Sequence, residues 1–169
     1  MTLTLSGQPL AIADLLSVAR DRAKVRVETE AHQRMTASRA VVDAALSDGL
    51  AHYGINTGFG SLSRQRIAPG DLRTLQRNLI RSHAAGVGDP LPNEVVRAMM
   101  LLLAASLCRG NSGVRPVLAE TVVALLNAGI TPIVPETGSV GASGDLAPLS
   151  HVALALIGEG EVMHEGRRI

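Results

Sequence analysis

Apolar residues recur every three or four positions along most of the chain, which is the spacing of one face of a helix. This pattern predicts helices in residues 12–23, 30–49, 68–86, 92–110, 115–129 and 146–160. Glycine closes several of these segments, as is common at helix ends. The last segment, LAPLSHVALALIGEG, is apolar all round and is expected to be buried on every side, with His151 as a hydrogen-bonded core histidine.

Two short segments instead alternate polar and apolar residues, which is the period of a strand. Residues 1–7 and 24–28 predict strands near the N-terminus, and residues 161–169 predict a hairpin that turns at Glu165-Gly166. The second arm of this hairpin has barely begun at Ile169, and an unpaired edge strand is unfavourable. We therefore expect a mainly α chain, a single unit over 1–169 that is part of something larger.

Composition narrows the classes of function. Hydrophobic residues make up 46% of the chain and charged residues 18%, which argues against disorder. The net charge of +1, without a basic cluster, argues against a nucleic-acid partner. No apolar run reaches the roughly 20 residues that a membrane span needs. With Cys108 as its single cysteine, the chain is expected to be a cytoplasmic protein with no membrane partner.

Two common kinds of site fit the sequence poorly. Ser143 lies in GASGD, where Asp145 occupies the position of the second glycine of the GxSxG nucleophile motif. The histidines lack the i, i+4 pairing of a zinc-binding helix, so no metal is expected.

The stretch GSVGASGDLAPLSH, residues 138–151, allows a different chemistry. Gly144 lacks a Cβ, so its backbone nitrogen can approach the carbonyl carbon of Ala142. Ring closure there, with loss of water that includes the hydroxyl of Ser143, would leave an exocyclic alkene, an electrophile that no ordinary side chain supplies. Taken alone, however, the tripeptide favours a simpler interpretation, a glycine-rich turn with Ser143 as a helix cap.

Neighbouring motifs reverse that preference. The motifs are YGINTGFG (53–60), RSHAAGVGDPLP (81–92), RGNSGVRP (109–116) and GSVGASGDLAPLSH (138–151). Together, over essentially all 169 residues, they resemble the aromatic amino acid ammonia-lyases, and most closely the histidine ammonia-lyases among them. The resemblance implies the N-terminal part of the helical ammonia-lyase fold. It also implies that Ala142, Ser143 and Gly144 cyclise autocatalytically to 4-methylidene-imidazol-5-one (MIO), with no external cofactor.

The same resemblance assigns catalytic and substrate-binding residues. Tyr53 matches the family's acid/base tyrosine. Ser82 and His83 match the pair that faces the substrate side chain in histidine-specific members, where phenylalanine lyases have Phe-Leu and tyrosine lyases have His-Leu. An imidazole at this place can exchange a hydrogen bond with a substrate imidazole. The implied reaction is elimination of ammonia from L-histidine to give trans-urocanate.

Three further residues are expected to support this site. Asn56 is expected to shape the tyrosine loop, and Gly60 to let it move. Asp145 is expected either to assist ring closure or to cap the helix that begins at Leu146.

Full-length members of the family are longer and form homotetramers whose later portion supplies further active-site groups. The resemblance therefore implies that the C-terminal helical portion is absent, that it or other subunits are partners, and that the isolated chain is inactive or nearly so. Two alternatives stay open. One is a phenylalanine or tyrosine ammonia-lyase or an aminomutase of the same family, against which Ser82-His83 speaks. The other is a non-catalytic truncated paralogue that acts as an interaction partner.

Overall fold

A computed structural model describes residues 2–141 and 144–169. The described residues are mainly helical, as the apolar periodicity predicts. The α-helices are α1 (Ile12–Ala19), α2 (Thr29–Ser47), α3 (Leu72–His83), α4 (Asn93–Leu107), α5 (Pro116–Ala128) and α6 (Leu146–Leu156), with a short 3₁₀ turn, η1 (Gly60–Leu62). Each predicted helix is thus confirmed, with ends that differ from the prediction by a few residues.

The strands form three small sheets. Strand β1 (Thr2–Leu5) pairs in parallel with β2 (Lys24–Val27), β3 (Val87–Pro90) pairs antiparallel with β5 (Pro135–Thr137), and β6 (Val162–His164) lies between β4 (Thr131–Pro132) and β7 (Arg167–Arg168). The two N-terminal strands and the C-terminal hairpin are confirmed. Glu165 and Gly166 in the hairpin turn have φ values of 50° and 76°, the left-handed pair expected of a tight hairpin. Strands β3, β4 and β5 were not predicted, because their prolines hide any alternation.

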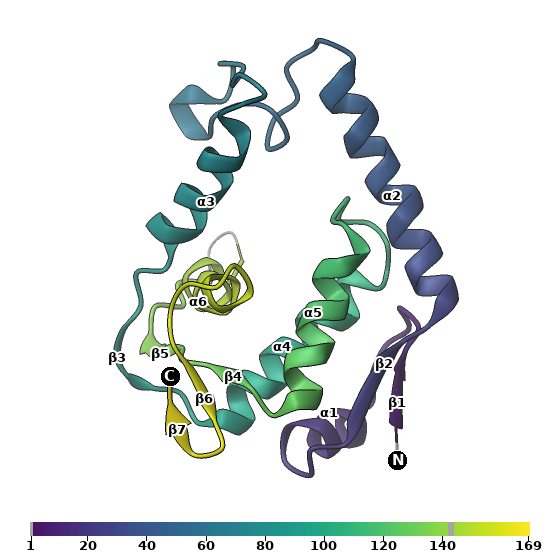
Figure 1. Ribbon diagram of the computed structural model, residues 1–169, viewed down its shortest axis with the longest axis vertical. Coiled ribbons are helices and arrows are strands. Elements are labelled where there is room, and N and C mark those ends of the chain that lie inside the picture. The colour runs from purple at the N-terminus through teal and green to yellow at the C-terminus, as the bar shows by residue number, and fades with distance from the viewer. Residues whose placement is uncertain (1, 142–143) are drawn as a thin grey trace.

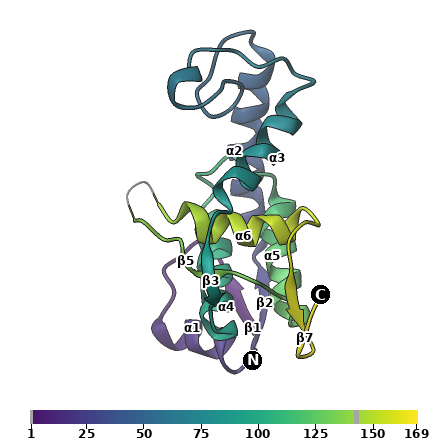
Figure 2. The ribbon, with the colours of Figure 1, turned by 90° about the vertical axis from the view of Figure 1, so that its left-hand side faces the viewer.

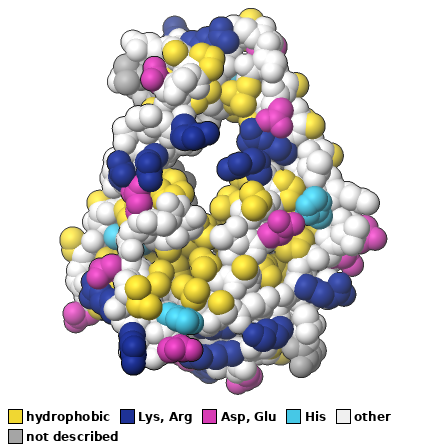
Figure 3. Space-filling view, viewed as in Figure 1, with side chains coloured by type: hydrophobic (Ala, Val, Ile, Leu, Met, Phe, Trp, Pro, Cys, Tyr) yellow, Lys and Arg dark blue, Asp and Glu magenta, His cyan; other side chains and the backbone are white. Residues whose placement is uncertain are grey.

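The helices form an arch (Figure 1). Helix α2 rises along one side and α3 descends along the other, and residues 48–71 join them at the end of the molecule far from the N-terminus (Figures 1 and 2). Helices α1, α4 and α5 with the β1–β2 pair make the base. Figure 3 shows an opening through the arch with Lys and Arg side chains at its border. A cavity of 630 Å³ on this opening is lined in part by Arg39, Arg73, Arg77 and Arg115.

The hydrophobic core lies in the base. Met100, Leu101 and Ala104 of α4 are fully buried, where α4 packs against α1 and α5. Burial of a Met or Leu side chain contributes about 1.5–3 kcal/mol, so this centre makes the base the rigid part of the arch.

Helix α6 differs from its prediction. Only Pro148 and Val152 of α6 are buried, and Leu146 is 44% exposed. Burial on every side is therefore wrong, because α3 and β4 cover part of the helix and leave the rest to solvent.

Arg97 is a buried cation within this core. It is 3% exposed, and its guanidinium donates hydrogen bonds to the carbonyls of Val18 (2.8 Å), Ala19 (3.3 Å) and Leu126 (3.1 Å). These carbonyls lie at the C-terminal ends of α1 and α5, where the helix dipole is negative. Burial, and after it the charge of Arg22, lowers the pKa of Arg97. Arg97 therefore satisfies two helix ends at once.

Replacing Arg97 by methionine is expected to lower the free energy of unfolding by about 2–4 kcal/mol, because buried carbonyls lose their donors. Urea unfolding followed by circular dichroism measures this. The matched control is Arg20→Met. Arg20 forms an ion pair with Glu94 on the exposed surface, and this pair is expected to contribute only about 0–1 kcal/mol to the free energy of unfolding. Equal effects of the two substitutions would contradict the role given to Arg97.

Candidate active site

The segment that holds Tyr53 is folded around a buried asparagine. Asn56 is 1% exposed; its Oδ1 accepts the backbone N–H of His52 at 2.7 Å, and its Nδ2 donates to the carbonyl of Leu50 at 2.8 Å. The backbone of Asn56 also accepts the N–H of Ile67 at 2.9 Å. The Asn56 side chain thus ties residues 50–52, before Tyr53, to the turn that follows Tyr53, which is how a loop-shaping residue acts.

Tyr53 itself lies at the surface, with 66% of its area exposed. Its ring meets Phe59 edge to face, with centroids 5.9 Å apart and planes at 69°. Gly60 follows Phe59 at the start of η1, with a φ of 57° and open space where a Cβ would lie. The Tyr53 ring therefore packs against one aromatic neighbour, and most of the residue is exposed.

The end of α3 presents His83 in a defined tautomer. Its Nδ1 lies 2.8 Å from the carbonyl oxygen of Leu79, which can only accept. Nδ1 is therefore the donor, and Nε2 of the neutral ring keeps its lone pair. The hydroxyl of Ser82 donates to the same carbonyl at 2.9 Å and lies 3.1 Å from the His83 ring. Ser82 thus contacts His83 within the helix end.

A cavity of 410 Å³ brings Tyr53 and His83 together. Its walls come from the tyrosine loop, α3 and α6. The remaining lining residues are Phe59, Leu79, Ile80, Leu146 and Ser150. The walls are mostly apolar with a few polar groups, as in small-molecule sites. Since α6 begins at Leu146, the lining residue Leu146 follows the Ala-Ser-Gly stretch after one intervening residue, Asp145.

Sequence reasoning missed five of these lining residues, although the helical repeat could have found four. Leu79 and Ile80 lie one turn before His83, and Leu146 lies one turn before Ser150. Ser82, which was predicted to bind substrate, is not among the residues that line the cavity.

The predicted precursors of the prosthetic group lie only partly within the described residues. Ala142 and Ser143 fall outside them. Gly144 has a φ of 105°, a conformation that residues with a Cβ rarely adopt, and no described atom lies within 4 Å of the place of a Cβ.

Asp145 makes no side-chain hydrogen bond to the start of α6, so its expected role as a helix cap is not supported. Among the described residues, its Oδ1 is buried without a hydrogen-bond partner. A buried carboxylate oxygen without a partner is uncommon in folded proteins and calls for an explanation.

Within residues 2–141 and 144–169, no group of three or more His, Cys, Asp and Glu side chains is arranged to hold a metal ion. In the same described part of the chain, no helix is both long and apolar enough to cross a membrane.

Comparison with known proteins agrees with the motifs. The profile of the family described as "Aromatic amino acid lyase" matches residues 10–169. The histidine ammonia-lyase of Geobacillus thermodenitrificans is 53% identical over 167 residues, which are 99% of this chain and 33% of the relative. That of Anaeromyxobacter dehalogenans is 54% identical over 160 residues, 95% of this chain and 32% of the relative. The chain thus spans about a third of the length of these relatives.

Solved structures share the fold. The ergothioneine-degrading enzyme ergothionase of Treponema denticola superposes with a TM-score of 0.96 and is 34% identical, with 100% of this chain and 34% of that chain covered. The histidine ammonia-lyase of Trypanosoma cruzi superposes with a TM-score of 0.91 and 40% identity, over 100% of this chain and 32% of that chain. The expected fold, the N-terminal part of the ammonia-lyase fold, is confirmed. With the family profile matched from residue 10 to residue 169, the chain belongs to the aromatic amino acid lyases.

Proposed function

We propose that the chain provides the N-terminal part of an ammonia-lyase that converts L-histidine to trans-urocanate and ammonia. One observation carries the proposal: a single cavity joins Tyr53, His83 and Leu146, the first residue of α6, which follows Gly144 by two positions. Histidine ammonia-lyases about half identical to this chain support the substrate. The remaining two-thirds of such a protein, or other subunits of a homotetramer, complete the site in this proposal, and the assembly is cytoplasmic.

Residues 142–144 are the proposed source of the prosthetic group MIO. The nitrogen of Gly144 bonds to the carbonyl carbon of Ala142, and that carbonyl's oxygen leaves as water with the amide protons of Gly144 and Ser143. The hydroxyl of Ser143 leaves as a second water with the proton of its Cα. In this proposal Asp145 assists ring closure, and its buried Oδ1, which has no hydrogen-bond partner among the described residues, supports that role. When present, MIO supplies an electrophile that turns the substrate amine into a better leaving group.

In the next step, residues of this chain take the β-proton of the substrate and orient its imidazole. The phenolate oxygen of Tyr53 takes the β-proton of the substrate and becomes the phenol, and the electrons of that C–H bond form the new double bond as the amine departs with the C–N pair. The lone pair on Nε2 of His83 accepts the N–H of the substrate imidazole, which orients the side chain. Leu79, Ile80 and Leu146 exclude water around it.

The test uses a chimera in which this chain replaces the matching third of the Geobacillus thermodenitrificans enzyme. Absorbance of the arylacrylate product of each reaction is followed with L-histidine, L-phenylalanine and L-tyrosine as substrates; the product from L-histidine is urocanate. We expect urocanate from L-histidine and little product from the other two. Product from phenylalanine or tyrosine instead would assign the chain to a phenylalanine or tyrosine lyase of the same family. No product from any of them, with the relative's own enzyme active in parallel, would favour a non-catalytic paralogue.

Replacing His83 by leucine in the chimera is expected to lower kcat/KM for L-histidine roughly 10-fold, the worth of one hydrogen bond of ~1.4 kcal/mol. Most of the loss should appear in KM, because the contact is made to the bound side chain throughout the reaction. The control is Ser82→Ala, which removes a hydroxyl that donates a hydrogen bond to the carbonyl of Leu79 in the same helix. Full activity of the leucine variant on L-histidine would refute the contact.

A further inference from the structure

His151 lies on α6 next to Ser150 but contacts another part of the molecule. Its Nε2 accepts the backbone N–H of Gly86 at 3.1 Å. Gly86 follows His83, the last residue of α3, by three positions. This one hydrogen bond therefore joins the end of α3 to the middle of α6, and these are the two helices that supply walls of the Tyr53–His83 cavity.

The backbone around this hydrogen bond is packed without room for another side chain. A Cβ on Gly86 would lie 3.0 Å from Nε2 of His151 and 3.2 Å from Cβ of Pro135. A Cβ on Gly138 would lie 3.1 Å from Cα of Gly86 and 3.3 Å from Cβ of Ala147. The segment after α3, the segment after β5 and the first turn of α6 thus meet at one point, and the last two flank the loop with the Ala-Ser-Gly tripeptide.

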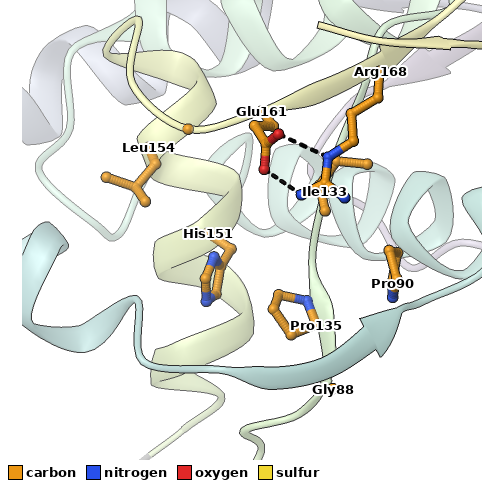
Figure 4. A pocket seen from close by; sticks show the side chains of 9 residues that line it. Gly88, Pro90, Ile133, Pro135, His151, Leu154, Glu161 and Arg168 are labelled. Carbon is orange, nitrogen blue, oxygen red and sulfur yellow. Dashed lines mark hydrogen bonds and ion pairs between the residues drawn. The ribbon is translucent and has the colours of Figure 1, made fainter.

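The His151 ring also borders a separate cavity of 280 Å³. Figure 4 shows the ring beside Pro135, and the ion pair of Glu161 and Arg168 lies in the same cavity. Burial lowers the pKa of the His151 imidazole. The neutral ring, whose Nε2 has the lone pair that the Gly86 contact requires, is accordingly the favoured form.

We propose that His151 is a positioning residue for the Tyr53–His83 cavity. By accepting the N–H of Gly86, its imidazole fixes the last turn of α3 against α6 and so sets where His83 stands relative to Ser150. The proposal rests on the proposed function only in taking this cavity as the substrate site. Without the hydrogen bond, the short link after His83 is free to shift, and a misplacement of about 1 Å can lower the rate of a reaction roughly 100-fold.

The first test needs no activity. NMR spectra of the isotope-labelled chain are compared for wild type, His151→Leu and His151→Gln. Leucine cannot accept a hydrogen bond, whereas the Gln carbonyl oxygen can. We expect His151→Leu to shift the Gly86 amide upfield and to move the ring signals of His83, and His151→Gln to restore both. The matched control is Leu154→Ala, which removes bulk from the same cavity wall and should leave both sets of signals in place.

A second variant tests the same contact in case His151→Leu does not fold. Gly86→Ala keeps the N–H but puts a methyl group against the imidazole, and it should move the same His83 signals. Unchanged His83 signals in a folded His151→Leu or Gly86→Ala chain would overturn the proposal.

In the chimera, His151→Leu should lower kcat/KM for L-histidine roughly 100-fold and His151→Gln should restore most of it. An inactive wild-type chimera would count against the proposed function alone, since the His83 signals still decide the role of His151. An active chimera in which the leucine variant equals wild type would count against the positioning role alone.

Discussion

Replacing Ser143 by alanine is expected to prevent the two-water mass loss of the chain and to abolish the activity of the chimera. Alanine has no hydroxyl to leave as the second water, so the exocyclic alkene cannot form. The wild-type chain should weigh about 36 Da less than its sequence, the mass of two waters, whereas the alanine variant can lose one water at most. Activity on L-histidine should fall by more than about 10⁴-fold, beyond the range of one acid–base group.

The matched control is Ser139→Ala, an exposed serine four residues earlier in the same loop. This variant should keep the mass loss and the activity, because its hydroxyl takes no part in ring closure. Intact-mass spectrometry and urocanate absorbance, measured on the same preparations, separate formation of the prosthetic group from its use. A full-mass wild-type chain with an active chimera would show that the ring forms only when the rest of the protein is present. Activity of the alanine variant would contradict the proposed electrophile.

The sequence was sufficient for elements whose signal is local. Periodicity found α3 and α4, and Glu165-Gly166 marked a tight turn that any hairpin of this kind requires. Long motifs identified the family, since the spacing of glycines and small residues in GSVGASGDLAPLSH reflects chemistry more than packing.

Contacts between distant segments could not be predicted in the same way. Strands β3 and β5 pair across more than forty residues and contain proline, so neither alternation nor propensity marks them. The acceptor role of His151 depends on where Gly86 comes to lie, and the sequence indicated only that this histidine would have a partner. Composition likewise suggested that α6 would be buried, but burial depends on which elements cover it, and α3 and β4 cover only part.

The candidate site shows the same difference between local sequence signals and contacts of distant segments. Tyr53 and His83 were predicted separately from motifs, and the structure places both on one cavity. Their neighbours Phe59 and Ser150 lie within two of these motifs, but the motifs gave them no role, and their place on the cavity became visible only in the structure. Residues that act by chemistry were thus easier to find than residues that act by position.

Replacing Tyr53 by phenylalanine is expected to lower kcat of the chimera by about 10²–10⁴-fold, the usual contribution of a group that moves a proton in the rate-limiting step. KM should change little, because the ring and its edge contact with Phe59 remain. The prosthetic group should still form, so the chain should show the same mass loss as wild type. A loss in kcat with the mass unchanged assigns the defect to proton transfer.

The variant Phe59→Leu distinguishes a role of Tyr53 in proton transfer from a purely structural role. That variant keeps the phenol but removes its aromatic partner, a contact worth about 0.5–1.5 kcal/mol, so activity should fall by roughly 10-fold or less. If Tyr53 acted only through packing, Phe59→Leu would be the more damaging change, because Tyr53→Phe preserves the packing. Since the phenol is 66% exposed and the described contact of its ring is the one with Phe59, the opposite order is expected.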